Sequence, residues 1–170
     1  MSEKYTRSSL RKYFLTEGNI LITSVPTDII TVLGSCVSVC IWDKQLKLGG
    51  INHYLLPGNL NEDSNNASRG SSATDMLIKS FINRKSNIKD LEAKVFGGCN
   101  SIHQNDVGKK NIEIAFKKLK EAGIPIVASH TGGSFGRKII FNTRTGKVLM
   151  RLLNKSLSDL NDEIARGLGV

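Results

Sequence analysis

The residues best suited to chemistry in this sequence are a cysteine and a histidine, Cys36 and His53. The chain has three cysteines and three histidines, and Cys36, Cys40 and His53 all fall around one predicted hairpin. A free thiol is mostly protonated at neutral pH, but an imidazole that accepts its proton creates a thiolate, which attacks amides and esters. The spacing alone also fits a buried cysteine and a structural histidine. We interpret Cys40 in that second way, as a small core residue.

Two strand-like segments, 37–42 and 48–56, predict the hairpin that would bring the pair together. With a loop of even length centred between positions 44 and 45, Cys36 lies directly opposite His53. Directly opposed residues of antiparallel strands share one face, with Cβ atoms about 4.5–5.5 Å apart. An odd loop would shift the register and place the two residues diagonally. The sequence thus predicts a Cys–His pair within reach of a hydrogen bond.

Small residues flank both members of this pair. Gly34 and Ser35 permit a sharp turn just before Cys36, which would expose the sulfur and leave backbone N–H groups free to bind an oxyanion. Gly49 and Gly50 lie on the second strand of the predicted hairpin. Because they have no side chains, we expect them to leave the surface beside the pair open to a substrate.

The remaining cysteines and histidines form no recognised metal motif. Cys36-x-x-x-Cys40 and Cys99-x-x-x-His103 lack the paired CxxC or HExxH spacing that is typical of zinc sites. The segment GGSFGRK at 132–138 is too short for a Walker loop, and no Ser or Thr follows its lysine, so a turn is the better interpretation. We therefore expect no metal and no cofactor.

Length and composition favour a single domain over residues 1–170. A chain of 170 residues can bury a core without disulfides or metal. We expect a basic N-terminal segment at 1–12 and a C-terminal tail at 154–170 to be peripheral. The low cysteine content and the absence of an apolar stretch in the first residues favour a reducing cytoplasm. No run of about 18 apolar residues occurs, so we expect no direct membrane insertion.

The charge balance is basic, with 24 Lys and Arg against 15 Asp and Glu and a net charge of +9. Such a balance invites a nucleic-acid interpretation. Aromatic residues make up only 6% of the chain, however, and the basic residues are scattered along it. We therefore expect no nucleic-acid partner, and instead either a solvated basic surface or an acidic protein partner.

Alternating helix and strand patterns predict an α/β (α+β) layered sandwich, with mixed, largely antiparallel β-sheets flanked by two or three helices. One helix is predicted from a capping box at Ser72-x-x-Asp75, and a second over 112–119 that ends at Gly123. A short third helix is predicted from Ser158 to Ile164, and a surface loop over 59–72. Strands are predicted at 19–23, 29–33, 37–42, 48–56, 91–96, 124–129, 139–141 and 148–153.

Five segments occur in an order and at a spacing that are specific in combination, although each alone is weak. They are TVLGSCVSVCIWD, GGINHYLLPG, LEAKVFGG, VGKKNIEIAFKKLKEAGIPIVASHTGG and GRKIIFNTRTGKVLMR. Together they resemble the CheD family of chemoreceptor glutamine deamidases, and the similarity covers residues 13–153. The resemblance implies a fold similar to that of the cytotoxic necrotising factor-type cysteine deamidases.

The resemblance implies that Cys36 is the nucleophile, that His53 is the general base, and that a threonine just upstream of the nucleophile orients the histidine. Thr31 is the candidate for that threonine. It lies five residues before Cys36, whereas some relatives place the threonine six residues before, where this chain has Ile30. The implied reaction hydrolyses receptor glutamine side chains to glutamate through a thioester, with a methylesterase side activity.

The resemblance also implies partners. The substrate would be the cytoplasmic coiled-coil domain of chemoreceptors, whose acidic modification regions suit a basic enzyme. A CheC-type phosphatase would be a second binding partner. Two alternatives stay open from the sequence: a regulatory binding module for that phosphatase with weak catalysis, and another thiol hydrolase such as a transglutaminase.

Overall fold

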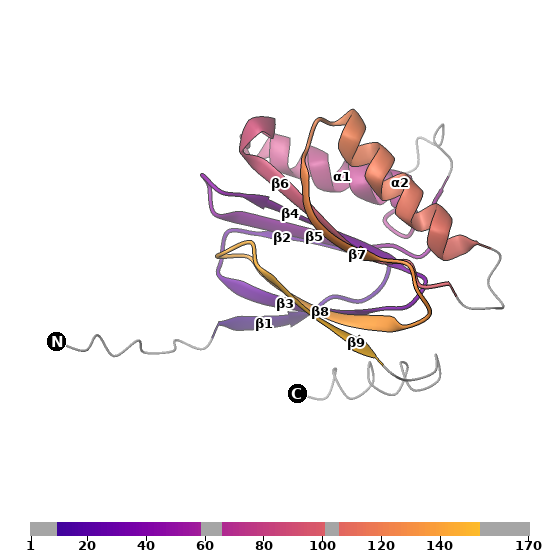
Figure 1. Cartoon of the computed structure of the whole chain (residues 1–170). Helices are drawn as coiled ribbons and strands as arrows, with labels where there is room; N and C mark the ends of the chain where they lie inside the picture. Colours follow the sequence, from indigo (N-terminus) through magenta and orange to yellow (C-terminus); the bar gives the residue numbers. More distant parts are fainter. Residues whose placement is uncertain (1–9, 59–65, 101–105, 154–170) are drawn as a thin grey trace.

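The computed structural model describes residues 10–58, 66–100 and 106–153. Its elements in chain order are β1 Arg11–Phe14, β2 Asn19–Thr23, β3 Thr27–Leu33, β4 Val37–Asp43, β5 Leu48–His53, α1 Gly70–Asn83, the 3-10 helix η1 Ile88–Asp90, β6 Leu91–Gly97, α2 Val107–Glu121, β7 Ile126–Thr131, β8 Gly136–Asn142 and β9 Val148–Leu153. Within these residues, a five-stranded sheet of order β2-β5-β4-β6-β7 lies between the two α-helices and a four-stranded sheet of order β1-β3-β8-β9 (Figure 1). No helix in the described segments is long and apolar enough to cross a membrane.

This architecture confirms the predicted layered sandwich of mixed, largely antiparallel sheets. The β1–β3 and β6–β7 pairs are parallel, and the other strand pairs are antiparallel. Two predicted helices are present as α1 and α2, whereas the third, Ser158–Ile164, lies outside the described residues. Strand β1 was not predicted, and it includes Arg11 and Lys12 from the segment expected to be peripheral.

The two faces of strand β4 contribute to two different apolar clusters. Val37, Val39 and Ile41 are fully buried and cluster with apolar residues of α1 and α2. Cys40 is 1% exposed and clusters instead with residues of the four-stranded sheet such as Ile29. Successive side chains of a strand point to opposite faces, so the five-stranded sheet has a separate core on each face. The prediction that Cys40 is a small core residue is confirmed.

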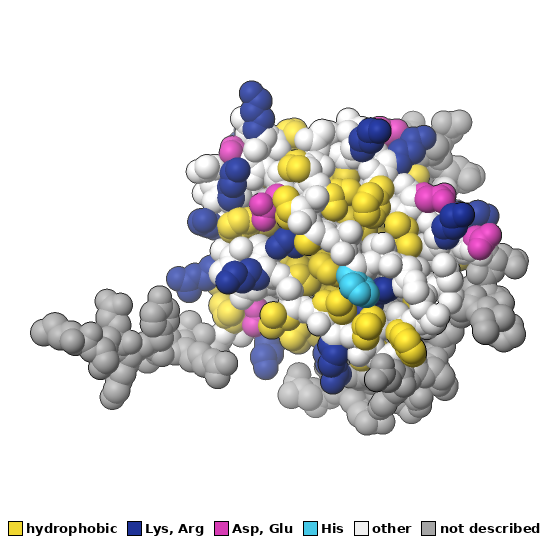
Figure 2. All heavy atoms as spheres, viewed as in Figure 1, with side chains coloured by type: hydrophobic (Ala, Val, Ile, Leu, Met, Phe, Trp, Pro, Cys, Tyr) yellow, Lys and Arg dark blue, Asp and Glu magenta, His cyan; other side chains and the backbone are white. Residues whose placement is uncertain are grey.

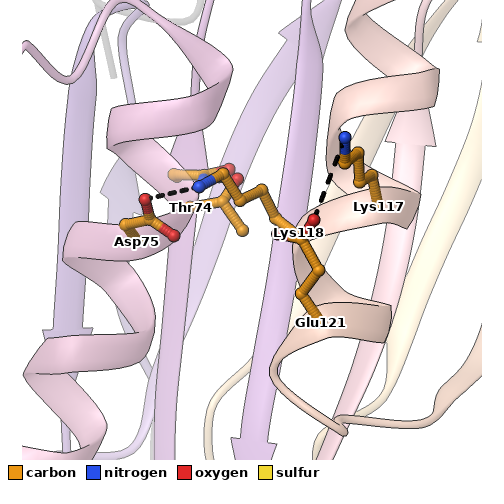
Figure 3. A network of polar contacts seen from close by, with 6 residues as sticks. Thr74, Asp75, Lys117, Lys118 and Glu121 are labelled. Carbon is orange, nitrogen blue, oxygen red and sulfur yellow. Dashed lines mark hydrogen bonds and ion pairs between the residues drawn. The ribbon is translucent and has the colours of Figure 1, made fainter. Parts of the chain in front are cut away.

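Helix α1 begins at Gly70, with Arg69 at the N-cap position and no side-chain capping bond. The predicted capping box is therefore wrong, because Ser72 lies inside the first turn and is buried. Asp75 instead reaches α2, where its carboxylate pairs with Lys118 Nζ at 2.7 Å (Figure 3). Partly exposed pairs of this kind contribute about 1 kcal/mol or less, so apolar burial is the main force that holds the helices on the sheet.

The β4–β5 hairpin has a register displaced by two residues from the predicted one. Cys40 pairs with Ile51, and the strand pairing continues to Asp43. The Asp43 side chain explains the difference, since its Oδ1 accepts hydrogen bonds of 2.9 Å from two backbone N–H groups of the loop. This turn moves the centre of the loop along the chain. Cys36 is therefore placed diagonally from His53 and not directly opposite it.

Gly49 and Gly50 lie beneath neighbouring layers of the fold and not beside a substrate surface. Both are buried. A Cβ on Gly50 would lie 2.7 Å from Phe81 Cε2 and 2.9 Å from Leu77 Cδ1 of α1, and a Cβ on Gly49 would meet Thr143. The expectation that these glycines keep a substrate surface open is wrong. They allow α1 to approach one face of β5 and the turn after β8 to approach the other.

Replacement of Gly50 by alanine should lower the free energy of unfolding by about 1–3 kcal/mol, the usual cost of overpacking a core. Urea denaturation of the variant and the wild type measures this loss. Phe81→Leu makes room at the contact, so Gly50→Ala should cost less in a Phe81→Leu background than in the wild type. Equal costs in the two backgrounds would show that the contact with α1 is not the source.

Candidate active site

The predicted site residues lie on neighbouring strands and turns. Thr31 is in β3 of the four-stranded sheet, and His53 is the last residue of β5 in the five-stranded sheet. Cys36 occupies the turn between β3 and β4, while Leu15 and Glu17 belong to the connection between β1 and β2. The site therefore lies between the two sheets, and each sheet supplies one member of the Thr31–His53 pair.

A hydrogen-bond relay fixes the ring of His53. Thr31 Oγ1 donates to the Leu15 carbonyl oxygen at 2.8 Å and lies 2.8 Å from His53 Nδ1. A hydroxyl has one proton, and here it is given to Leu15, so the Thr31 oxygen is left to accept and Nδ1 must carry the ring proton. The other ring nitrogen, Nε2, then has a free lone pair. It is buried and has no hydrogen-bond partner among the described residues.

The Cys36 sulfur lies close to this ring. Cys36 Sγ, a ring nitrogen of His53 and a carboxylate oxygen of Glu17 all lie within 4.8 Å of one another. Since Nδ1 is engaged by Thr31, Nε2 is the nitrogen free to take the thiol proton. Distances between reacting groups are often longer than a hydrogen bond before substrate binds. The structure thus brings Cys36, His53 and Thr31 together and adds Glu17, which was not predicted.

Asn111 of α2 holds the two chain segments that carry Cys36 and His53. Its Nδ2 donates to the Ser35 carbonyl oxygen at 3.0 Å and to the Leu55 carbonyl oxygen at 2.8 Å. One amide group therefore links the turn just before the cysteine to the segment just after the histidine. The Asn111 side chain is fully buried, whereas Ser35 and Leu55 are partly exposed, so these bonds are partly shielded from competition with water.

The double glycine at 97–98 packs on the backbone of Cys36. The Gly98 N–H donates to the Cys36 carbonyl oxygen at 2.8 Å. Gly97 has a φ of 114°, and a Cβ there would collide with the same oxygen. These contacts engage carbonyl groups of the turn. Within the described part of the chain, the backbone N–H groups of Ser35 and Cys36 donate to no other residue, so they are available to an oxyanion.

Burial keeps both reactive groups neutral at rest. Desolvation, with a smaller contribution from the Glu17 carboxylate, raises the pKa of Cys36 to about 12. Desolvation also lowers the pKa of His53 to about 4. The thiolate expected from the sequence is therefore not the resting species, because burial penalises the thiolate and the imidazolium alike. Transfer of the Cys36 proton to His53 is therefore unfavourable in the resting site.

A pocket of about 170 Å³ adjoins the site. Ligand pockets for free small molecules usually span about 300–1,000 Å³, so this volume suits a single side chain better. Its lining combines apolar and polar side chains: Phe14, Leu15, Thr16, Glu17, Thr31, Val32 and His53.

Two residues of this site were missed by the sequence analysis. Asn111 is a polar residue on the buried stripe of α2 that also carries Ala115 and Leu119. An asparagine on an apolar stripe was the available signal, because a buried amide needs partners. Glu17 lies in a short connection, and no pattern in the sequence links it to Cys36.

Comparison with known proteins places the chain in a family. The family model described as CheD chemotactic sensory transduction matches residues 55–152. A probable chemoreceptor glutamine deamidase CheD of Trichlorobacter lovleyi is 42% identical over 147 residues, covering 84% of this chain and 91% of that protein. The chain belongs to the CheD family. The probable chemoreceptor glutamine deamidase CheD of Rhodospirillum rubrum is 40% identical over 89% of this chain and 88% of that protein.

The CheD family model begins after Thr31, Cys36 and His53, and its match includes the double glycine and Asn111, which support the Cys36 turn. Among solved structures, YlmD from Geobacillus stearothermophilus aligns with a TM-score of 0.47 at 11% identity, over 71% of this chain and 59% of that one.

His53→Asn should remove a pH dependence of stability. An unfolded histidine has a pKa near 6.5, whereas burial lowers the pKa of His53 to about 4. Between these values the unfolded chain binds a proton that the folded chain does not. Stability is therefore full above about pH 6.5 and falls as the pH drops toward 4, by about 2 kcal/mol between about pH 7.5 and about pH 5.

Asparagine retains an amide donor near the Nδ1 position but does not titrate in this range. Urea unfolding of the wild type and His53→Asn at the two pH values, in metal-free buffer, gives the comparison. The wild type should lose more stability on acidification than the variant. The same loss in both proteins would contradict the assignment of the effect to His53.

Proposed function

We propose that this CheD-family chain is a chemoreceptor glutamine deamidase, a cysteine hydrolase that converts specific receptor glutamines to glutamate. The two relatives above carry this activity in their names. The observation that supports it most directly is the bond between Thr31 and His53, since it leaves Nε2 unprotonated on a ring that has one nitrogen within 4.8 Å of Cys36 Sγ. This is the arrangement that a general base and its nucleophile require.

The proposed reaction has two halves. In the first, His53 Nε2 takes the thiol proton as Cys36 Sγ attacks the side-chain carboxamide carbon of glutamine. The backbone N–H groups of Ser35 and Cys36 hold the oxyanion, His53 returns the proton to the departing nitrogen, and ammonia leaves a thioester. In the second, His53 deprotonates a water that attacks the thioester. The products are glutamate and the free Cys36 thiol.

The third residue of the proposed site, Thr31, contributes a neutral hydroxyl group. As His53 takes the proton, the Thr31 oxygen continues to accept the Nδ1–H, and the Leu15 carbonyl continues to accept the Thr31 hydroxyl. This relay holds the ring and its tautomer through both halves of the reaction. It offers the imidazolium a dipole but no carboxylate charge, in keeping with a pair that is neutral at rest.

The adjoining pocket supports a side-chain substrate. Its apolar lining suits the methylene stem of glutamine, and its polar lining includes His53 and Thr31. A glutamyl methyl ester has a similar shape and would form the same thioester with loss of methanol, so the proposal includes a methylesterase side activity.

The charge pattern supports an acidic protein as substrate. On the face shown in Figure 2, Lys and Arg side chains lie apart around the periphery, and no single basic patch forms there. Together with the net charge of +9, this favours diffuse attraction to an acidic partner over a defined nucleic-acid site.

We propose the cytoplasmic coiled-coil domain of chemoreceptors as that substrate, with the enzyme in the cytoplasm. A CheC-type phosphatase, proposed by family resemblance alone, is a second partner.

Cys36→Ala and His53→Ala should each abolish deamidation of a purified receptor fragment, because they remove the nucleophile and its base. Intact-mass measurement gives the readout, since each conversion adds about one mass unit. The double variant should be no worse than either single variant, because the two residues act as one unit. Cys99→Ala is the matched control and should remain active. Full deamidation by Cys36→Ala would exclude the assignment.

Thr31→Val should lower turnover and should also reduce stability. Thr31 is fully buried, so valine leaves the His53 Nδ1–H and the Leu15 carbonyl without their partner, at a cost of about 1–3 kcal/mol. Thr31→Ser keeps the hydroxyl and should retain most of the activity. Turnover under saturating receptor, measured where urea unfolding shows each variant to be folded, separates the two effects. Equal turnover of the valine and serine variants would remove Thr31 from the mechanism.

A further inference from the structure

Three possible metal ligands from separate segments converge at the mouth of this site. Glu17 comes from the β1–β2 connection, Cys36 from the turn before β4, and His53 from the end of β5. Their ligand atoms all lie within 4.8 Å of one another. In addition, His53 Nε2 is buried and has no hydrogen-bond partner among the described residues. We propose that Glu17, Cys36 and His53 form a reversible Zn²⁺ site, and that the bound metal inhibits the enzyme.

The spacing of the three donors is close to what zinc requires. Ligand atoms of a tetrahedral zinc site lie about 3.5 Å apart, given metal–ligand bonds of about 2.0–2.3 Å. The approach needed is about 1 Å, and Glu17 can supply much of it because its side chain is exposed and free to change rotamer. Cys36 is half-buried in a turn, whereas His53 is fixed. Glu17 is therefore the ligand that moves most, toward the fixed ring of His53.

The hydrogen bonds from His53 through Thr31 to Leu15 resemble those that orient metal-binding histidines. Metal-bound imidazoles usually donate their other N–H to an oxygen acceptor, which fixes the tautomer and the direction of the lone pair. Here Nδ1 donates to Thr31 Oγ1, and Nε2 is left as the ligand atom. The metal would thus use the same lone pair that the proposed reaction uses to accept a proton.

The donor set selects the class of metal. A thiolate, an imidazole and a carboxylate suit Zn²⁺, whereas Mg²⁺ and Ca²⁺ prefer oxygen ligands alone. Binding replaces the S–H bond of Cys36 by an S–Zn bond and releases that proton to solvent. A fourth position stays open for water. The metal would then occupy both the nucleophile and the base, so inhibition should be complete in the loaded fraction.

Calorimetric titration of the full chain with ZnCl₂, in two buffers of different ionisation enthalpy, measures affinity, stoichiometry and proton release. One Zn²⁺ per chain should bind with release of a proton. Glu17→Gln should weaken binding at least tenfold relative to Glu113→Gln, which makes the same charge change at an exposed position of α2. Titration with Co²⁺ should give a thiolate charge-transfer absorption that Cys36→Ala loses and Cys99→Ala keeps.

Equal Zn²⁺ affinity in Glu17→Gln and Glu113→Gln, a thiolate band that survives in Cys36→Ala, or no binding by the wild type would each overturn the site. Metal binding does not depend on the proposed deamidase function, but inhibition does. A chain that binds Zn²⁺ as described yet never deamidates receptor would refute the function and keep the site. A chain that deamidates receptor equally well with saturating Zn²⁺ would refute the inhibitory site and keep the function.

Discussion

The hydrogen bond between Thr31 and His53 is the interaction on which the rest of this site depends. This bond joins β3 of one sheet to β5 of the other, so it can form only when the two sheets are stacked at the right distance. The Leu15 carbonyl completes it by taking the only proton that the hydroxyl can give. The two sheets thereby set the position of the His53 ring, with the proton on Nδ1 and a free lone pair on Nε2.

Burial determines how that base must work. An exposed Cys–His pair could rest as thiolate and imidazolium, but desolvation moves the two pKa values apart, to about 12 for Cys36 and about 4 for His53. Both groups are then neutral at rest, and the thiolate–imidazolium pair is disfavoured. A pair that is neutral at rest is less nucleophilic than a thiolate–imidazolium pair, because the thiolate is the nucleophile. For an enzyme that modifies selected glutamines of another protein, such restraint favours selectivity over speed.

Sequence patterns predicted the layers of the fold, and the resemblance to the CheD family predicted the three residues that the structure brings together, but neither predicted their geometry. The hairpin was predictable because strand alternation is a local signal, whereas its register was set by the Asp43 carboxylate in the turn, which propensities do not describe. The roles assigned to Gly49 and Gly50 were wrong because contacts with α1 and the turn after β8 depend on the packing of distant segments. Glu17 was unpredictable for the same reason.

Residues in the second half of the chain support the turn that carries Cys36, which belongs to the first half. Residues 55–152 match the CheD family model, yet Thr31, Cys36 and His53 all precede them. The double glycine permits the end of β6 to press against the Cys36 backbone, and Asn111 ties Ser35 to Leu55. Both features act on carbonyl groups, and among the described residues no other residue accepts a hydrogen bond from the N–H groups of Ser35 and Cys36. An oxyanion site must offer donors that nothing else has claimed. The glycines and the asparagine contact the turn through its carbonyl groups, so they support the turn without using its N–H groups.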